Sequence, residues 1–270
     1  MAITHNAAHQ QKTEEFQRVE EIKFYKDQAG VLKAVTQGQA DAGIIDGLIA
    51  LNLIYKKPEF RDLRLAGNIL YQEPVSVAFK RNDDSLRLAV NRGLIGIIEN
   101  GIYESISKHY FGRDVSADLK ITRTYRDNAQ ADDGSWKKIR LADELRFAMR
   151  GDNPPFSYLN QSNQLTGFDV ELAWEVCIQL GIKNMIPVLV EPKDLLNGLI
   201  AGRYDGIWGS MRITEENLAV VDFSIPYYLT GARLVVPKNS PITGPETLVL
   251  PVFPEPPPLK GRDDRPVKWE

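Results

Sequence analysis

The feature of this sequence that most constrains its fold is an internal repeat. Residues 22–46 (IKFYKDQAGVLKAVTQGQADAGIID) and residues 186–210 (IPVLVEPKDLLNGLIAGRYDGIWGS) align without a gap, so that Gly38 falls on Gly202. Each copy predicts a short strand, a helix that ends at the glycine, and a second strand. This strand-helix-strand crossover is the unit from which parallel sheets covered by helices are built.

Two copies that lie far apart in the chain indicate two similar α/β lobes, because a solenoid would repeat at a short period. Parallel sheets of this type place ligands beyond the carboxyl ends of their strands. Asp46 and Ser210 end the two equivalent strands of the repeat. If the lobes face each other, both residues therefore point into one cleft.

The segments around the repeat indicate how the lobes are joined. Residues 71–83 and 230–240 are β-rich runs that become basic at their ends, and they are candidate hinge strands. Residues 86–112 have helical periodicity interrupted by three glycines and predict two helices. Residues 116–136 are polar and without a clear period, and we interpret them as a linker or surface loop.

Composition excludes several classes of function. The chain has 270 residues, 33 Lys and Arg against 36 Asp and Glu, and a formal net charge of -3, so it carries no broad basic field for nucleic acid. No apolar stretch reaches the roughly 20 residues of a membrane span, and no secretory signal is visible at the start. Cys177 is the single cysteine and lies in an apolar pattern, which predicts a core residue and no disulfide.

Several segments resemble one known family. Residues 151–176, 202–217 and 221–238, in that order, resemble the first lobe of bacterial periplasmic solute-binding proteins of the polar amino acid class, extracellular solute-binding family 3. Residues 38–46 and 91–112 resemble that family's second lobe and the helices that return to the first. The resemblance implies an α/β two-lobed clamshell with crossing hinge strands.

The family's later half comes first in this chain. The chain is a fragment across the junction of two tandem binding domains, a circular permutant, or a truncated or frameshifted product, and we favour a junction fragment whose halves assemble into one permuted clamshell. The expected parts are a second-lobe segment at 1–74, a hinge strand and returning helices of the first lobe at 75–115, a linker at 116–136, the first lobe at 137–237, and a second hinge exit with a proline-rich tail at 238–270.

The second lobe is expected to be incomplete. In the family this lobe opens with a strand and a helix start, of which only MAITHN is present here. Thr4 is expected either to cap a helix whose amides face the cleft or to be a plain cap. A missing central strand would expose an edge of the sheet.

The resemblance also implies ligand contacts. The family binds a carboxylate through an arginine three residues after the threonine of an ITxxR motif; here Thr214 is present, but Asn217 stands at the arginine position. Arg212 either supplies this charge or points to solvent. Asp46 stands where the family receives an α-ammonium group, although a strand-end aspartate can instead cap the following helix.

Two aromatic positions of the family are also changed. They hold Asn153 and Pro192 here, while Phe156 remains close by, in a PPF motif that more often packs the lobe. These departures predict a changed or lost specificity. The expected ligand-binding set is Ser210, Arg212, Thr214, Asn217, Asp46, Thr4, Asn153 and Phe156.

The leading hypothesis is a periplasmic or extracytoplasmic receptor without a cofactor. It binds a small polar solute, either an amino acid or a related small carboxylate or amine, and serves an ABC permease or a sensor kinase domain. One alternative is a dehydratase-like enzyme on the same fold, with Asp46 or His5 as acid or base. Another is a nonbinding structural domain. His5 and His9 would share a helix face, but no third metal ligand has a recognisable spacing, so we expect no metal site.

Overall fold

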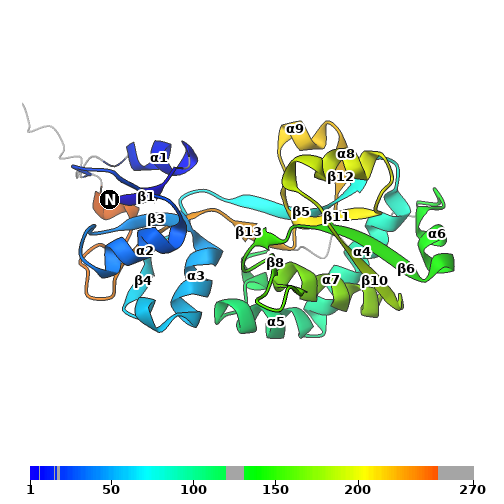
Figure 1. Ribbon diagram of the computed structural model, residues 1–270, viewed down its shortest axis with the longest axis horizontal. Helices are drawn as coiled ribbons and strands as arrows, with labels where there is room; N and C mark the ends of the chain where they lie inside the picture. Colours follow the sequence, from blue (N-terminus) through cyan, green and yellow to red (C-terminus); the bar gives the residue numbers. More distant parts are fainter. Residues whose placement is uncertain (6, 15, 17–18, 120–130, 249–270) are drawn as a thin grey trace, which may run out of the picture.

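The computed structural model describes residues 1–248 apart from residues 6, 15, 17–18 and 120–130. It consists of two α/β lobes joined by two extended crossings, which lie side by side in Figure 1. The expected two-lobed α/β fold with crossing strands is confirmed. We name residues 73–230 the first lobe, and residues 1–66 with 232–248 the second lobe.

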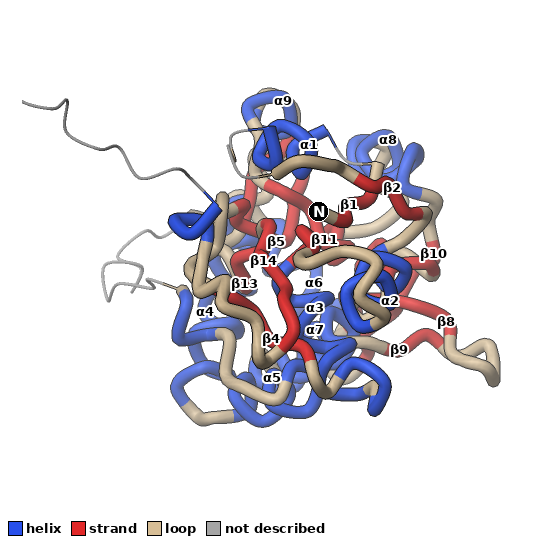
Figure 2. Tube along the Cα trace, turned by 90° about the vertical axis from the view of Figure 1, so that its left-hand side faces the viewer, coloured by secondary structure: helices blue, strands red, loops and turns tan. Residues whose placement is uncertain are grey.

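The second lobe has a five-stranded sheet in the order β2-β1-β3-β14-β4. β1, β2 and β3 are parallel, whereas β14 is antiparallel to both β3 and β4. Figure 2 looks onto this lobe from its outer end. The strands are β1 (Ala2–Thr4), β2 (Lys23–Tyr25), β3 (Gly43–Asp46), β4 (Leu63–Ala66) and β14 (Ala232–Pro237).

Helices cover this sheet because their apolar residues share one face. In α2, Asp27 caps the first turn by accepting the backbone N–H of Gly30 at 2.8 Å, and Val31, Leu32 and Val35 are buried against the sheet. The helices of the second lobe are α1 (Ala7–Glu14), α2 (Gln28–Thr36), α3 (Gly47–Lys56), η1 (Pro58–Phe60) and η5 (Pro245–Leu248).

The first lobe has a six-stranded sheet in the order β10-β6-β11-β5-β12, with β13 also paired to β5. β7, β8 and β9 form a small separate sheet. The strands are β5 (Glu73–Lys80), β6 (Glu144–Met149), β7 (Asp152–Asn153), β8 (Ser157–Leu159), β9 (Leu165–Thr166), β10 (Asn184–Leu189), β11 (Gly206–Arg212), β12 (Val221–Phe223) and β13 (Tyr228–Thr230).

Helices cover both faces of this sheet. Successive strand residues point to opposite faces, so Trp208 of β11 lies in the core cluster with α4, α5 and α7, while Ile207 lies in the cluster with α8. The helices are α4 (Asp84–Glu99), α5 (Ile102–Phe111), η2 (Ser116–Asp118), α6 (Ser135–Ala142), α7 (Phe168–Gln179), η4 (Pro192–Asp194), α8 (Leu195–Ile200) and α9 (Glu215–Leu218). Within the described residues, none of the helices is long and apolar enough to cross a membrane.

The repeat predicted from the sequence is confirmed. Its two copies are β2-α2-β3 and β10-α8-β11, and in each copy one further parallel strand, β1 or β6, lies between the two repeat strands. Gly38 and Gly202 follow the two helices with φ values of 69° and 70°, the left-handed region that glycine adopts without strain. The two helices expected over 86–112 are α4 and α5, which meet at Gly101.

The short remnant MAITHN supplies the central strand whose loss would have exposed an edge of the second-lobe sheet. Ala2–Thr4 forms β1, which pairs with both β2 and β3 in the interior of the sheet. Three residues are enough to form this interior strand, because the side chains of Ala2 and Ile3 are fully buried and the backbone is paired on both sides. Thr4 is the last residue of this strand, opposite Tyr25.

Three further expectations are corrected by the strand pairing and helix bounds. The first lobe does not extend to residue 237, because β14 pairs with β3 and β4 of the second lobe. Ser210 does not end its strand, since β11 continues to Arg212. His5 precedes α1 and stacks on Phe24, with ring centroids 4.8 Å apart, so it does not share a helix face with His9.

Two expected segments fall partly or wholly outside the described residues. The structure describes the expected linker only outside residues 120–130, and Ser135 and Trp136 at its end belong to α6. Residues 249–270, which contain the proline-rich tail, are outside the description as well. Cys177 is fully buried in the first-lobe core, as predicted.

Backbone hydrogen bonds hold the two crossings against the second lobe. The backbone N–H of Leu70 donates to the carbonyl of Ala232 at 2.8 Å, and the N–H of Gly47 donates to the carbonyl of Gly231 at 2.9 Å. The lobes also meet below the crossings, where the Asn52 side chain of α3 donates to the carbonyl of Tyr110 in α5 at 2.8 Å. The carboxyl ends of the parallel strands of both sheets therefore face the same space.

Candidate ligand-binding site

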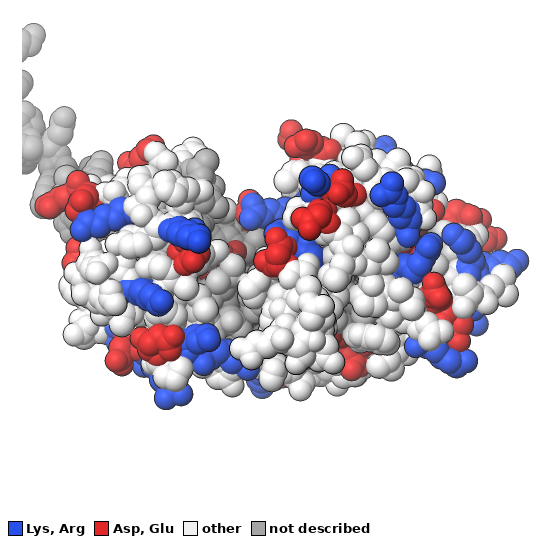
Figure 3. Space-filling model, viewed as in Figure 1, with Lys and Arg blue, Asp and Glu red and all other residues white. Residues whose placement is uncertain are grey.

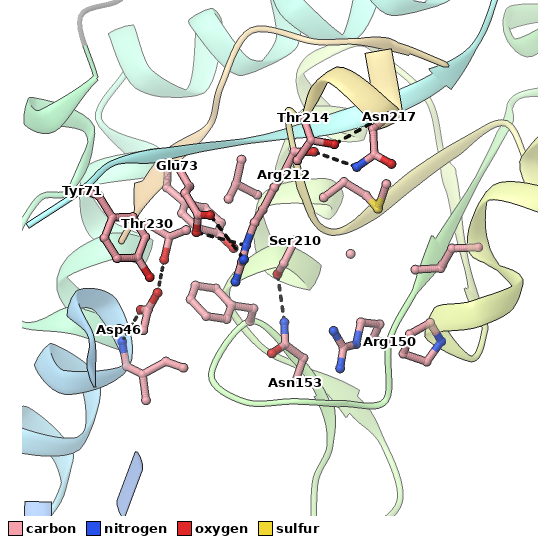
Figure 4. Close-up of a pocket in the computed structure, with 18 of the residues that line it drawn as sticks. Asp46, Tyr71, Glu73, Arg150, Asn153, Ser210, Arg212, Thr214, Asn217 and Thr230 are labelled. Atoms are coloured by element: carbon pink, nitrogen blue, oxygen red, sulfur yellow. Dashed lines mark hydrogen bonds and ion pairs between the residues drawn. The ribbon is translucent and has the colours of Figure 1, made fainter. Parts of the chain in front are cut away.

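A cavity of about 510 Å³ lies between the lobes, at the carboxyl ends of β3 and β11. Figure 3 shows the hollow between the two lobes, and Figure 4 shows the side chains within it. The second lobe contributes Gln28, Asp46 and Ile49, the crossing from β4 to β5 contributes Tyr71, and the ends of β5 and β13 next to the crossings contribute Glu73, Tyr228 and Thr230. The first lobe contributes, among others, Arg150, Asn153, Phe156, Pro192, Ser210, Arg212, Thr214, Glu216 and Asn217.

Asp46 lies at the start of α3 and also lines the cavity. Its Oδ1 accepts the backbone N–H groups of Leu48 and Ile49 at 3.0 and 3.1 Å, which caps α3. Its Oδ2 accepts the hydroxyl of Thr230, a residue of the crossing strand β13. The same carboxylate therefore caps a helix and faces the cavity.

Ser210 links the cavity to a buried acid. Ser210 has a φ of 58° at an irregularity in the pairing of β11 with β5, which turns its side chain out of the regular strand alternation. Its Oγ accepts from Asn153 Nδ2 at 3.0 Å and donates to Asp169 Oδ2 at 2.9 Å.

Asp169 was not identified from the sequence. It is fully buried at the start of α7, and burial raises the pKa of its carboxyl to about 7. The available signal is an acid in the first turn of a largely apolar helix, FDVELAW, where Glu171 is a second acid. That signal is ordinary for a helix N-terminus, where acids are favourable, and it does not reveal that the carboxyl lies behind the cavity.

Arg212, Thr214 and Asn217 form a compact turn at the end of β11. Thr214 caps α9 by accepting the backbone N–H of Asn217 at 3.2 Å, and Asn217 Nδ2 donates to the carbonyl of Arg212 at 3.0 Å. The Arg212 guanidinium pairs with Glu73, with Nε 3.3 Å from Oε2. Arg212 therefore lines the cavity with its charge already matched by a carboxylate.

Sequence reasoning also missed Glu73, Tyr71 and Arg150. Glu73 and Tyr71 lie in the run predicted as a hinge strand, so the signal for their position was present, but nothing local indicated that they face a ligand. Burial raises the pKa of Tyr71, and the neighbouring Glu73 carboxylate raises it further. Arg150 pairs with Asp152, with Nε 2.9 Å from Oδ1.

Phe156 is nearly buried and stacks on Tyr228, with ring centroids 5.0 Å apart and planes at 11°. It packs the first-lobe core and also borders the cavity. Of the expected ligand-binding set, the cavity brings together seven members: Ser210, Arg212, Thr214, Asn217, Asp46, Asn153 and Phe156. Thr4 is not among the described residues that line it.

The chemistry of this lining is hydrogen bonding and charge. The described residues around the cavity include amides, hydroxyls, carboxylates and two guanidinium groups, but no histidine, cysteine or lysine. Across the part of the chain that the structure describes, no group of three or more His, Cys, Asp or Glu side chains is placed to hold a metal ion. The arrangement is suited to holding a small polar molecule.

Part of the chain is similar to known proteins. Residues 145–265 match the model of the bacterial extracellular solute-binding proteins, family 3. Over 110 residues the chain is 30% identical to the L-cystine-binding protein TcyJ of Escherichia coli (strain K12), a match that covers 41% of each protein. It is 35% identical over 107 residues to the histidine-binding periplasmic protein of Salmonella typhimurium, covering 39% of this chain and 38% of the relative.

A solved structure of the arginine-bound form of truncated ArgBP from T. maritima is also similar, with 34% identity and a TM-score of 0.33 over 34% of this chain and 43% of that chain. The chain spans about two fifths of the length of the curated relatives that it matches. The resemblance to family 3 solute-binding proteins is thus confirmed over residues 145–265.

Proposed function

We propose that this protein binds a small polar solute, an amino acid or a related small amine or carboxylate, between its two lobes. The observation that carries the proposal is the cavity between the lobes, which is lined by Asp46 on one side and by Ser210 and Arg212 on the other. Its volume of about 510 Å³ lies in the range of roughly 300–1,000 Å³ of small-molecule sites. The relatives named above are binding proteins for cystine and histidine, which supports this class of solute.

Binding would work by closing the lobes. A solute shifts an open-to-closed equilibrium only if it binds the closed form better, so both lobes have to contribute contacts. The two crossings are the covalent links between the lobes, and closure would change the backbone angles there. The closed form would be read by an ABC permease or a sensor kinase domain outside the cytoplasm.

The geometry of Asp46 favours binding over acid–base catalysis. A general acid or base needs a carboxyl group that is free to exchange a proton with the substrate. Asp46 already accepts two amide N–H groups and one hydroxyl, so both of its carboxylate oxygens are engaged in the folded protein. His5, the other candidate, is not among the described residues of the cavity lining.

The test is ligand-induced stabilisation with a matched pair of variants. Wild type, Asp46→Asn and Asp27→Asn are melted in the presence of a panel of amino acids, small carboxylates and amines. Both aspartates cap a helix of the second lobe, and asparagine preserves a cap, so both variants should melt close to wild type without ligand. Only Asp46 lines the cavity.

A ligand at 100 times its Kd should stabilise wild type and Asp27→Asn by about 2.7 kcal/mol. Asp46→Asn should lose most of that stabilisation. If a well-folded wild type shows no shift across the panel, the binding proposal is wrong and a structural role is favoured. Turnover of a panel member would favour the alternative of a dehydratase-like enzyme on the same fold.

A further inference from the structure

Some of the charged side chains around the cavity form ion pairs with described residues and others do not. Among the described residues, the charged side chains that line it are Asp46, Glu73, Arg150, Arg212 and Glu216. Both arginines are held by carboxylates, Arg212 by Glu73 and Arg150 by Asp152. A solute carboxylate therefore meets cations whose charge is already neutralised.

The other cation expected here is replaced. Asn217 uses its side-chain amide to bind the carbonyl of Arg212, so it stabilises the turn and carries no charge. Arg212 could serve a carboxylate in its place, but Glu73 lies on the adjacent antiparallel strand and pairs with the guanidinium at both Nε and Nη1, at 3.3 and 3.4 Å. Glu73 thus occupies the position that a ligand carboxylate would take.

An acidic corner lies beside this pair. In Figure 4, Asp46, Tyr71, Glu73 and Thr230 gather on one side of the cavity. Burial is the main cause of the raised pKa of the Tyr71 phenol, and the Glu73 and Asp46 carboxylates raise it further, while Arg212 lowers it. Glu216, on the first turn of α9, is a further carboxylate of the lining but lies on the first-lobe side of the cavity. This corner favours a cationic group.

We propose that Glu73 is a specificity-determining residue: by holding Arg212, it selects amines that lack a carboxylate over the amino acids with the same side chain. This inference rests on the proposed binding function and narrows its ligand class. The amine would be received in the acidic corner, at Asp46. The Glu73 side chain is 30% exposed and that of Arg212 is 53% exposed, so the pair can be altered without opening the core.

The experiment compares ligand pairs that differ only by the α-carboxylate. Titration calorimetry measures the binding of agmatine and arginine, cadaverine and lysine, and histamine and histidine. The proteins are wild type, Glu73→Gln, the double variant Glu73→Gln with Arg212→Gln, and Glu215→Gln. Glu215 lies beside the site on α9 but is not among the described lining residues, so it controls for a general change in charge.

Wild type and Glu215→Gln should bind at least one amine about 10-fold or more tightly than its amino acid. Glu73→Gln releases Arg212 to bind the ligand carboxylate. The affinity for the amino acid should therefore rise about 10- to 100-fold relative to that for the amine, which corresponds to the free energy of a hydrogen bond to a charged group. The double variant should lose this gain, because the gain requires the guanidinium.

Two results overturn the inference and leave the binding function intact. One is a wild type that prefers the amino acid in every pair it binds. The other is a ratio that does not change in Glu73→Gln, with wild-type circular dichroism showing that the variant is folded. If none of the six probes binds to wild type, the inference is also overturned, and the broader melting panel decides separately whether the protein binds any solute.

Discussion

At the scale of single residues, a buried acid stands behind the cavity. Asp169 accepts a hydrogen bond from Ser210 at 2.9 Å, while its Oδ1 has no hydrogen-bond partner within the described residues. Burial disfavours the ionised form and raises the pKa of this carboxyl from 3.8 to about 7. At Asp169 the folded protein therefore binds more protons than the unfolded chain between these two values, so the contribution of Asp169 to the free energy of unfolding falls as pH rises from about 4 to 7.

Asp169→Asn should remove this dependence. Asparagine keeps a polar group of similar shape but does not ionise, so the free energy of unfolding of the variant relative to wild type should increase as pH rises from about 4 to 7. Urea unfolding of both proteins at several pH values measures this difference in the free energy of unfolding. Exposed Asp41→Asn is the control and should run parallel to wild type. If the free energy of unfolding of Asp169→Asn ran parallel to that of wild type over this pH range, burial would not raise the pKa of Asp169.

At the scale of elements, glycines set where strands and helices end. Gly38 and Gly202 have positive φ angles but open space where a Cβ would lie. Gly231, between β13 and β14, has a φ of 144°, and a Cβ there would lie 1.8 Å from the carbonyl oxygen of Tyr71. The first two glycines are required by backbone conformation alone, whereas Gly231 is also required by the close approach of the two crossings.

Gly38→Ala and Gly202→Ala should therefore cost a similar amount, about 1–2 kcal/mol each of free energy of unfolding, since alanine is strained at positive φ. Gly231→Ala should cost more than either, because the clash with a backbone carbonyl adds to the strain. Chemical denaturation of the three variants provides the comparison. Equal losses at all three sites would mean that the crossings separate easily.

At the scale of the whole molecule, the two lobes have largely separate cores. Two of the buried apolar clusters consist of second-lobe residues, and the other two consist of first-lobe residues with Leu48 of α3 as the exception. The second lobe is built from the chain segments before and after the first lobe, so its sheet depends on pairing between segments distant in sequence. Such a lobe can lose structure while the first lobe remains folded.

Ile3→Asp tests this independence. Ile3 is fully buried in β1, and an unpaired charge there should unfold the second-lobe sheet. Hydrogen exchange should then show lost protection in residues 23–66 and 232–237, with protection retained in the first-lobe strands β6 and β11. Ile178→Asp, at a side chain that is 62% exposed, should leave both lobes protected. Loss of protection in both lobes with Ile3→Asp would indicate a single cooperative unit.

The sequence by itself determined the features that depend on local pattern. Apolar spacing at Val31, Leu32 and Val35 sets the buried face of α2, the glycines after α2 and α8 stop those helices, and the repeat predicts two lobes of one design. These follow because helix periodicity and positive φ are properties of a few consecutive residues.

The tertiary structure alone decided which distant groups meet. β1 enters the middle of a sheet, Glu73 neutralises Arg212 from a neighbouring strand, and Asp169 reaches Ser210 from a helix. Each contact joins segments far apart in the chain, and charge or polarity alone does not specify its partner. Strand order and the approach of two sheets determine these pairings, and with them the charge that a solute meets in the cavity.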